Sequence, residues 1–447
     1  MNLTDKFFAL FQRDAILLFA TLLTGIVIAR KLGPELMGIW MILMLIPGYA
    51  EAAGRFQYDV SAVYFIGKKK ADLGEVTLIL HLTASTAALL VSSVFFLNFE
   101  WFYQQLFSNI ESDVRVFAAG IFAVFPLRLV FLNYSYLLVA QEDIKGYNLL
   151  VVVQALATAL LSIFFIMVLD LGISGAVLGS LTGVSIAIVY GAAVAQRRDG
   201  LLSNLNKKLL LDMGKYASHF YLNNVIGYLQ NNITSVISAV FLSPAQVAFY
   251  ALGKSMCEVS TRMVPAAINT ALYPHISRLE DDDESALLVA RLFRMTLLIL
   301  TASSLFLSAL IRPIVDILYG SPYSPIIVPF LIIIPGVILA QAGSVFSTFF
   351  SGQGRSDLLP KASFIPLALQ VLLSTTLISR YGVSGAAIGY SASMLCLFII
   401  QAALFVNLSR VSIYRLIPGQ DDVRSICAGI LYRLERYLDW RDRWRKK

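Results

Sequence analysis

Residues 250–265 read Tyr250-Ala-Leu-Gly-Lys254-Ser-Met-Cys-Glu258-Val-Ser-Thr-Arg262-Met-Val-Pro265, and they constrain how the whole chain folds. The segment is mostly apolar, yet Lys254, Glu258 and Arg262 recur every four residues, so an α-helix would place them on one face. A charged side chain at the centre of a bilayer costs about 2.5–3.5 kcal/mol on insertion scales. We therefore expect the remaining helices to surround this face and keep it away from lipid.

The composition is that of a polytopic membrane protein. Of the 447 residues, 58% are hydrophobic and 14% are charged, and the mean hydropathy is +0.74. Soluble domains carry about 25% charged residues. The net charge of +7 comes from basic residues concentrated in short loops and the C-terminal segment, which membrane topology favours. We therefore expect no nucleic-acid partner.

Hydropathy predicts twelve transmembrane helices, because a span needs about 20 mostly apolar residues. Six fall near 14–32, 36–54, 76–98, 114–139, 147–169 and 173–196, and six more near 217–242, 245–272, 287–311, 325–351, 362–380 and 384–409. Lys and Arg gather in alternate connections, so the positive-inside rule puts both termini in the cytoplasm.

Two pairs of motifs indicate an internal repeat. Residues 32–40 (LGPELMGIW) match 242–250 (LSPAQVAFY), and residues 172–179 (GISGAVLG) match 382–389 (GVSGAAIG), both at an offset of 210 positions. Each half holds six spans, which predicts parallel repeats related by an axis along the membrane normal. The predicted organisation is an N-lobe, a cytoplasmic linker, a C-lobe and a basic amphipathic tail over 1–196, 197–214, 215–409 and 410–447.

The seventh span is rich in amide and hydroxyl side chains. Asn223 and Asn231 fall roughly on one helical face. Asn224, Tyr228 and Asn232 fall on an adjoining face. Such residues either join helices by hydrogen bonds, worth about 0.6–2 kcal/mol each, or line a water-filled cavity. Both interpretations stay open here.

Intramembrane charges elsewhere support a central cavity. Arg128 follows Pro126 in the fourth span and is expected to face the bundle rather than lipid. Glu51, Arg55 and Asp59 repeat the four-residue spacing near the cytoplasmic end of the second span.

The set at 254, 258 and 262 is either a self-neutralising ladder or an anion site, since it keeps one net positive charge. A phosphate or another anion is the natural ligand of buried Arg and Lys. We therefore predict a cavity between the lobes that is basic at mid-depth.

No enzymatic motif is present. The sequence has no Ser/His/Asp set, no HExxH and no Gly-rich loop between a strand and a helix. Its three cysteines form no metal-ligand or disulfide framework. His219, near the start of the seventh span, is either a structural histidine or a titrating group. We expect a protein that is not an enzyme and binds no cofactor or metal.

Five short motifs occur in order along the chain: ARKLGPELMG at 29–38, YPHISR at 273–278, LYGSPY at 318–323, GQGR at 352–355 and YGVSGAAIG at 381–389. With these motifs the whole chain resembles the polysaccharide biosynthesis transporter family, the O-antigen-type lipid-linked oligosaccharide flippases of the MOP flippase superfamily. The resemblance implies an all-α, MOP/MATE-like membrane fold with two six-helix lobes around a central cavity.

The resemblance also implies a function. Such proteins move undecaprenyl-pyrophosphate-linked repeat units across the bacterial cytoplasmic (inner) membrane by alternating access, for O-antigen, capsule or exopolysaccharide synthesis. Carried over, it implies pyrophosphate contacts from Arg128, Lys254, Arg262, Arg55 and Arg30, and sugar contacts from Asn223 and Asn231. Glu258 and His219 would couple transport to a proton or sodium ion, and membrane lipids, polymerases or glycosyltransferases would be partners.

Two other functions compete with this one. A multidrug or cation antiporter of the same superfamily prefers an acidic cavity, and the excess of basic residues here disfavours it. A membrane-embedded glycosyltransferase or polymerase needs acidic catalytic residues on a large periplasmic loop, and no connection in this sequence is long enough.

Overall fold

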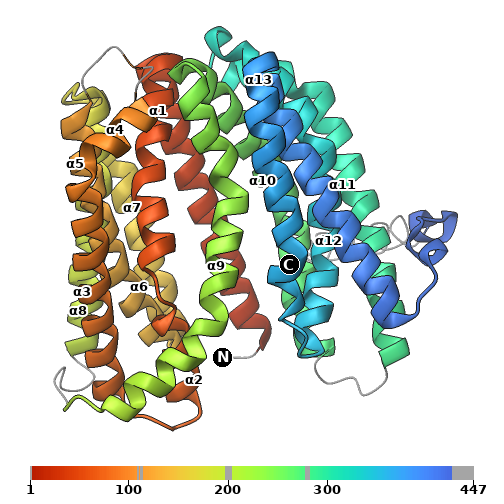
Figure 1. Ribbon diagram of the computed structural model, residues 1–447, viewed down its shortest axis with the longest axis horizontal. Helices are drawn as coiled ribbons and strands as arrows, with labels where there is room; N and C mark the ends of the chain where they lie inside the picture. Colours follow the sequence, from red (N-terminus) through yellow and green to blue (C-terminus); the bar gives the residue numbers. More distant parts are fainter. Residues whose placement is uncertain (1–2, 108–109, 111–113, 197–203, 277–281, 425–447) are drawn as a thin grey trace, which may run out of the picture. The chain divides into compact units, whose positions relative to one another are not determined.

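The computed structural model describes residues 3–107, 110, 114–196, 204–276 and 282–424 (Figure 1). Within these ranges every regular element is a helix, which confirms the predicted all-α class. The predicted amphipathic tail lies outside the described residues from position 425 onward. The elements in chain order are α1 (Leu3–Gly54), α2 (Tyr58–Gly67), α3 (Leu73–Leu97), α4 (Phe99–Phe107), α5 (Arg115–Phe122), α6 (Val124–Ala140), α7 (Ile144–Met167), α8 (Gly172–Gln196), α9 (Lys207–Phe241), α10 (Pro244–Ile276), α11 (Asp282–Leu318), the 3₁₀ helix η1 (Ser321–Ile326), α12 (Ile327–Gly352), α13 (Leu358–Ser409) and the 3₁₀ helix η2 (Ile413–Leu416).

The twelve predicted spans correspond to these helices. The two 52-residue helices α1 and α13 are each broken by a glycine, Gly33 with φ +78° and Gly382 with φ +56°, and so supply two spans each. Glycine lacks a Cβ and tolerates positive φ, which explains why the chain breaks at these residues. Helices α5 and α6 together form one span from 115 to 140.

Hydropathy alone singles out eight apolar helical stretches among the described residues, and α9 and α10 are not among them. Two of the eight are the double-length α1 and α13. The amides of α9 and the charges of α10 lower the hydropathy of these two helices, and such side chains are expected to face protein or water rather than lipid.

Several boundaries differ from those expected. Helix α9 begins at Lys207, ten residues before the predicted start at 217, because Asn206 caps it by accepting from the Leu209 N–H at 3.1 Å. The short helices α2 and α4 were not predicted, since ten and nine residues are too few to register as spans.

The repeat is visible in the backbone. Gly172 and Gly382, 210 positions apart, have φ of +57° and +56°. Seven residues later, Gly179 and Gly389 each press against a serine of the preceding helical segment, where a Cβ would lie 2.6 and 3.2 Å from the serine Cα. These serines are Ser162 on α7 and Ser374 in the first part of α13. The two helix pairs therefore pack through the same glycine contact.

The chain forms two compact units. The first comprises Met1–Ala251, Val315–Pro325 and Ile378–Val383, and the second comprises Leu252–Ile314, Ile326–Leu377 and Ser384–Lys447. Within the first unit, α9 packs on α1, α2 and α4. The lobe boundaries expected from sequence, and the cavity expected between the lobes, stay predictions.

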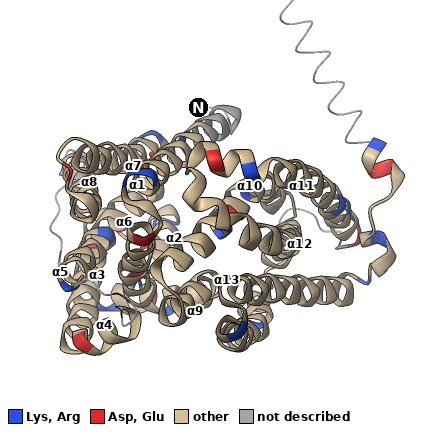
Figure 2. Ribbon diagram, turned by 90° about the horizontal axis from the view of Figure 1, so that it is seen from above, with Lys and Arg blue, Asp and Glu red and all other residues tan. Residues whose placement is uncertain are grey.

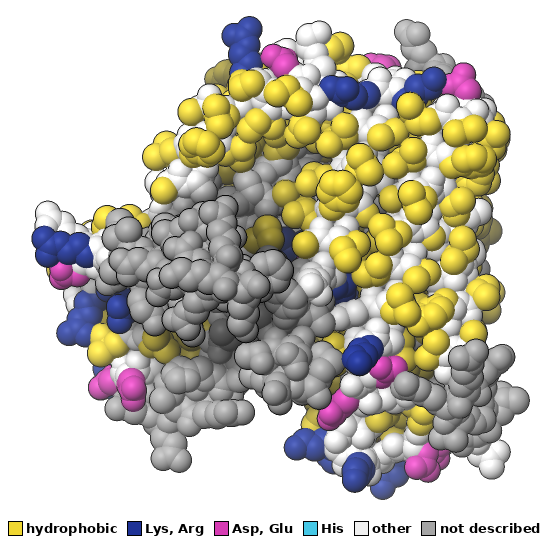
Figure 3. All heavy atoms as spheres, turned by 180° about the vertical axis from the view of Figure 1, so that it is seen from behind, with side chains coloured by type: hydrophobic (Ala, Val, Ile, Leu, Met, Phe, Trp, Pro, Cys, Tyr) yellow, Lys and Arg dark blue, Asp and Glu magenta, His cyan; other side chains and the backbone are white. Residues whose placement is uncertain are grey.

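Surface chemistry is that of a protein surrounded by lipid. Large apolar side chains are exposed, such as Leu97 at 85% and Leu89 at 71%. On the first unit, which lies to the right in Figure 3, hydrophobic side chains cover much of the visible surface, and charged side chains gather mainly near its upper and lower ends. Helices of this unit such as α3 and α8 appear nearly end-on in Figure 2, as expected for segments that cross a membrane together.

A buried ion pair anchors the segment that follows α13. The Arg294 guanidinium on α11 donates to both carboxylate oxygens of Asp422, at 2.8 and 3.0 Å, and to the carbonyl oxygen of Arg415. The Gly419 N–H also donates to Asp422, at 2.9 Å. Hydrogen bonding from Arg294 holds the pKa of the Asp422 carboxyl below its usual value.

Candidate functional site: a polar cavity in the first unit

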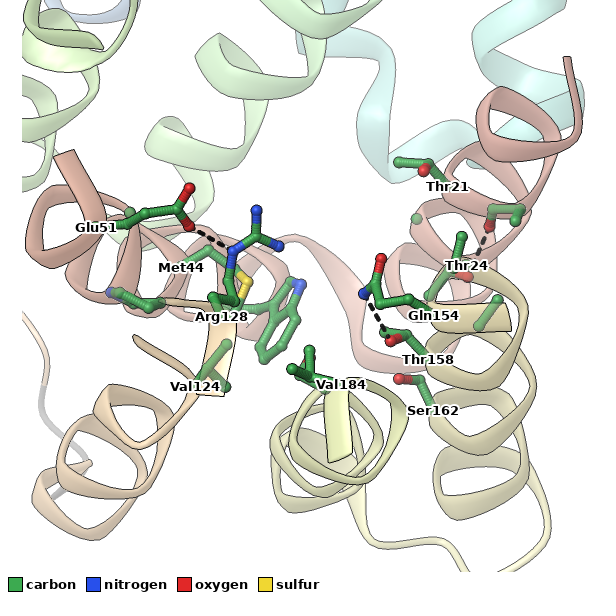
Figure 4. A pocket seen from close by; sticks show the side chains of 18 of the residues that line it. Thr21, Thr24, Met44, Glu51, Val124, Arg128, Gln154, Thr158, Ser162 and Val184 are labelled. Atoms are coloured by element: carbon green, nitrogen blue, oxygen red, sulfur yellow. Dashed lines mark hydrogen bonds and ion pairs between the residues drawn. The ribbon is translucent and has the colours of Figure 1, made fainter. Parts of the chain in front are cut away.

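The first unit contains a cavity of about 560 Å³ between α1, α6, α7, α8 and α9 (Figure 4). Both parts of α1 contribute, because the break at Gly33 folds the helix back on itself. The lining is apolar in part, with Trp40, Met44 and Val184. Its polar side chains are Thr21, Thr24, Glu51, Arg55, Arg128, Gln154, Thr158, Ser162, Ser180, Asn224 and Tyr228.

One wall of the cavity is basic. Arg128 on α6 donates from Nε to Oε2 of Glu51 at 2.5 Å, and the two side chains are 36% and 18% exposed. Figure 4 shows them pointing toward one another, with the outer guanidinium nitrogens directed into the open space. Within the described residues, those two nitrogens have no hydrogen-bond partner. They are therefore free to bind an anion from the cavity.

Arg55 extends the same wall. It pairs with Asp59 at 2.8 Å and stacks on the Tyr136 ring, with 5.1 Å from Cζ to the ring centroid. Asp59 is 4% exposed and lies behind Arg55 rather than in the cavity lining.

The even spacing of Glu51, Arg55 and Asp59 does not reflect one continuous helical face. Helix α1 ends at Gly54, Gln57 takes a left-handed conformation with φ +62°, and α2 begins at Tyr58. Because of this break, Asp59 pairs with Arg55, whereas Glu51 pairs with Arg128. Each cation therefore has its own carboxylate.

The opposite wall offers amide and hydroxyl groups from α7. Gln154 donates from Nε2 to Thr158 Oγ1 at 3.2 Å, and Ser162 lies one turn further along. Figure 4 shows all three projecting from the same helix. Sequence reasoning missed them, although their four-residue spacing in an otherwise apolar span was a usable signal.

Helix α9 presents Asn224 and Tyr228 to this cavity. Sugar contacts by Asn223 and Asn231 stay a prediction. Asn223 and Asn231 are exposed and do not belong to the lining. The two faces differ by a single 100° step along the helix, which is why residue spacing alone did not separate them.

The charged face of α10 lies in the second unit. Lys254, 7% exposed, pairs with Glu258 at 3.0 Å and lies 5.1 Å from the centroid of the Tyr390 ring. The Tyr390 hydroxyl donates to the same Glu258 oxygen at 2.9 Å. Arg262 is exposed and pairs with no carboxylate among the described residues. The predicted triad is thus one local ion pair and a separate cation.

Two further candidates are exposed and bonded to backbone. Arg30 donates to the carbonyl oxygens of Leu318, at 2.9 Å, and Ile317, the last two residues of α11. A cation there complements the negative end of the helix dipole. His219 Nδ1 lies 2.9 Å from the carbonyl oxygen of Lys215. Neither lines the cavity, so substrate binding by Arg30 and ion coupling by His219 stay predictions.

Among the residues that the structure describes, no group of three or more His, Cys, Asp or Glu side chains is placed to hold a metal ion. The ionic groups of the cavity are instead arranged as Arg–carboxylate pairs. Its chemistry is that of binding a polar, charged ligand by hydrogen bonds.

Comparisons with known proteins agree with this architecture. A family described as "Polysaccharide biosynthesis protein" matches residues 70–328. No curated protein matches the chain in sequence.

Solved structures share the fold. The lipid II flippase MurJ in an inward closed conformation has a TM-score of 0.72 and 13% identity, covering 98% of this chain and 99% of that one. An inward-facing multidrug resistance MATE transporter of the MOP superfamily has a TM-score of 0.68 and 16% identity, covering 88% and 95%.

A third similar structure comes from Pyrococcus furiosus. It is described as a MOP superfamily transporter with a binding pocket of reverse polarity. Its TM-score is 0.60 and its identity 14%, and the match covers 90% of this chain and 94% of that one. All three are transporters or flippases with the same helical architecture. The family match extends over more than half of the chain, and the chain therefore belongs to the polysaccharide biosynthesis protein family.

Proposed function

We propose that this protein is a flippase for lipid-linked oligosaccharides. It moves undecaprenyl-pyrophosphate-linked repeat units across the bacterial cytoplasmic membrane by alternating access, for O-antigen, capsule or exopolysaccharide synthesis, with both termini in the cytoplasm. The observation that supports it most is the cavity of the first unit, with arginines on one wall and amides and hydroxyls on the other. The structural likeness to a protein described as a lipid II flippase also supports it.

The two walls suit the two chemical parts of such a head group. The unengaged nitrogens of Arg128 can bind phosphate oxygens in the paired geometry that guanidinium favours, and Arg55 lies on the same wall. Gln154 and Thr158 offer donors and acceptors for sugar hydroxyls. A volume of about 560 Å³ is within the range of small-ligand sites.

The second unit supplies the proposed coupling group. Glu258 accepts hydrogen bonds from Tyr390 and forms an ion pair with Lys254, and its side chain is 35% exposed. Proton or sodium binding at Glu258 would release Lys254 and change the charge on α10. Arg262 has no described carboxylate partner and is proposed as a further phosphate contact.

A cation antiporter is the second candidate function. The fold match to a multidrug MATE transporter favours it, as do the carboxylates of Glu51 and Asp59. Each carboxylate is already paired with an arginine, so a bound cation would have to displace a guanidinium. This requirement makes an anionic ligand the better fit.

Deletion of the gene tests the proposal. We expect the lipid-linked sugar fraction to accumulate an undecaprenyl-pyrophosphate oligosaccharide on the cytoplasmic leaflet, and surface polysaccharide to disappear until the gene is restored. Unchanged lipid-linked sugars together with increased sensitivity to cationic drugs would contradict the flippase and support the antiporter.

A further inference from the structure

A second cavity in the first unit has the opposite chemistry. It has a volume of about 510 Å³ and lies between α1, α3, α4, α5 and α9. Almost all of its lining is aliphatic or aromatic, with Ile46, Val94, Phe95, Trp101, Phe122 and Val236 as examples. We call it the apolar groove. Val94 on α3 is one of the lining residues and is 58% exposed, so a bulkier side chain at this position would occupy part of the groove.

The apolar groove and the polar cavity share a wall. Along the second part of α1, Pro47, Gly48, Glu51 and Ala52 line the polar cavity, whereas Leu45, Ile46, Tyr49, Ala50 and Ala53 line the groove. Helix α9 is divided in the same way, with Tyr228 on the polar side and Val236 on the apolar side.

Two tyrosines form the partition between the two spaces. Tyr49 and Tyr228 meet edge to face, with ring centroids 5.0 Å apart. The Tyr49 hydroxyl is buried and, among the described residues, has no hydrogen-bond partner. A buried hydroxyl without a partner is unfavourable, because it has lost the hydrogen bonds that water would give it. The closed partition therefore leaves the Tyr49 hydroxyl in an unfavourable state. A movement of Tyr49 that let its hydroxyl bond to a phosphate or to water would remove this penalty.

We propose that the apolar groove binds the polyprenyl chain of the transported lipid while its head group occupies the polar cavity, with the Tyr49–Tyr228 pair between them. This inference rests on the proposed function. Head and tail of such a lipid are joined by one covalent linkage, so their sites must be adjacent, and these two cavities share a helix wall. Apart from Gln105 and the hydroxyls of Tyr49 and Tyr103, the groove walls are apolar, which fits a hydrocarbon and not a peptide with backbone groups to satisfy.

A matched pair of substitutions on α3 tests the groove. Val94→Trp fills its edge, and Leu90→Trp adds the same bulk one turn away at a residue that is 57% exposed but outside the lining. In vesicles with purified protein, we expect Val94→Trp to reduce transfer of a pyrophosphate-linked saccharide at least tenfold and Leu90→Trp to leave it near the wild-type rate. Equal rates for both variants, with Arg128→Ala inactive, would overturn the groove assignment and leave the flippase proposal intact.

A binding assay separates this inference from the proposed function. Protein in lipid nanodiscs is labelled with a diazirine-bearing polyprenyl phosphate that carries no sugar. We expect labelled peptides from 91–107 and 236–240, and competition by unlabelled undecaprenyl phosphate but not by phosphatidylglycerol. Equal competition by phosphatidylglycerol would show ordinary membrane lipid in the groove and overturn the proposal. Labelling as expected without any transport by the wild-type protein would instead count against the flippase function.

Discussion

The ion pair between Arg128 and Glu51 engages only Nε of the guanidinium and leaves its two outer nitrogens to the cavity. Glu51 therefore holds the cation in place without consuming its capacity to bind a ligand. A lysine at this position would have one charged nitrogen to divide between the carboxylate and a phosphate. The geometry thus accounts for an arginine at residue 128.

Substitution of Arg128 tests this arrangement. We expect Arg128→Ala to lower transport about 10- to 100-fold, because a hydrogen bond to a charged group contributes about 1.5–3 kcal/mol. Arg128→Lys should retain an intermediate rate. The double variant Glu51→Gln/Arg128→Ala should recover stability, since no unpaired carboxylate remains, but not transport. Transfer in vesicles and thermal unfolding measure the two effects.

The control for Arg128 is a surface lysine. Lys361 pairs with Asp357 at 2.8 Å, but both side chains are more than half exposed. Lys361→Ala should change neither transport nor stability measurably, since exposed ion pairs contribute little. A similar loss of transport in Arg128→Ala and Lys361→Ala would show that transport depends on the net charge of the protein rather than on an arginine in the cavity.

Gly38 on α1 packs directly against the backbone at the start of α10. A Cβ on this residue would lie 1.7 Å from the carbonyl oxygen of Pro244, the first residue of α10. We expect Gly38→Ala to destabilise the protein by about 1–3 kcal/mol through overpacking. The matched variant Gly25→Ala, on the same helix with no atom within 4 Å, should be neutral or slightly stabilising. Thermal unfolding in detergent compares the two.

The ion pair between Arg294 on α11 and Asp422, which follows α13, predicts that the attachment of this segment depends on pH. The folded-state pKa of Asp422 is lowered by Arg294, so its stabilising effect is complete above the usual carboxyl pKa of about 4. It is lost as the pH falls through the lower, folded-state value. We expect the segment 410–424 to become sensitive to protease at acidic pH in the wild type.

The comparison for this prediction is Asp422→Asn. The variant should be less stable by about 2 kcal/mol near pH 7 and should lack the acid-dependent step, because it has no carboxylate to protonate. Proteolysis between 410 and 424 over pH 3–7 measures both. An acid-dependent step that is the same in both proteins would assign it to another group.

The type of most elements could be predicted from the sequence, because a stretch of about 20 apolar residues is long enough to cross a membrane as a helix and has few other stable structures. Glycines at 33 and 382 marked the breaks, and their positive φ gives the physical reason. The short helices α2 and α4 were not predicted, because they form through packing against neighbouring helices rather than through a long apolar stretch. The early start of α9 depends on the cap by Asn206, and an asparagine just before a helical segment is a signal that the sequence contains.

The site was predictable only in part across the whole molecule. Arg128 and Arg55 were expected to face an interior, and they line the cavity. The partner of Arg128 was not predictable, because Glu51 is 77 positions away and only the fold brings them together. Lys254 and Glu258, four residues apart, form the local pair that their spacing allowed. Substrate contacts stay predictions for all the candidate residues: Arg128, Arg55, Arg30, Lys254, Arg262, Asn223 and Asn231.

The low hydropathy of α9 and α10 has a consequence for how the protein is made. An insertion machinery that releases each segment into lipid according to its own apolar content would hold these two back. Their amides and charges become tolerable only after other helices have shielded them. Biogenesis must therefore keep α9 and α10 beside the translocation channel until both have met their partners. Helix α1, already synthesised, packs on α9, whereas the charged face of α10 must await the later helix α13, which supplies Tyr390.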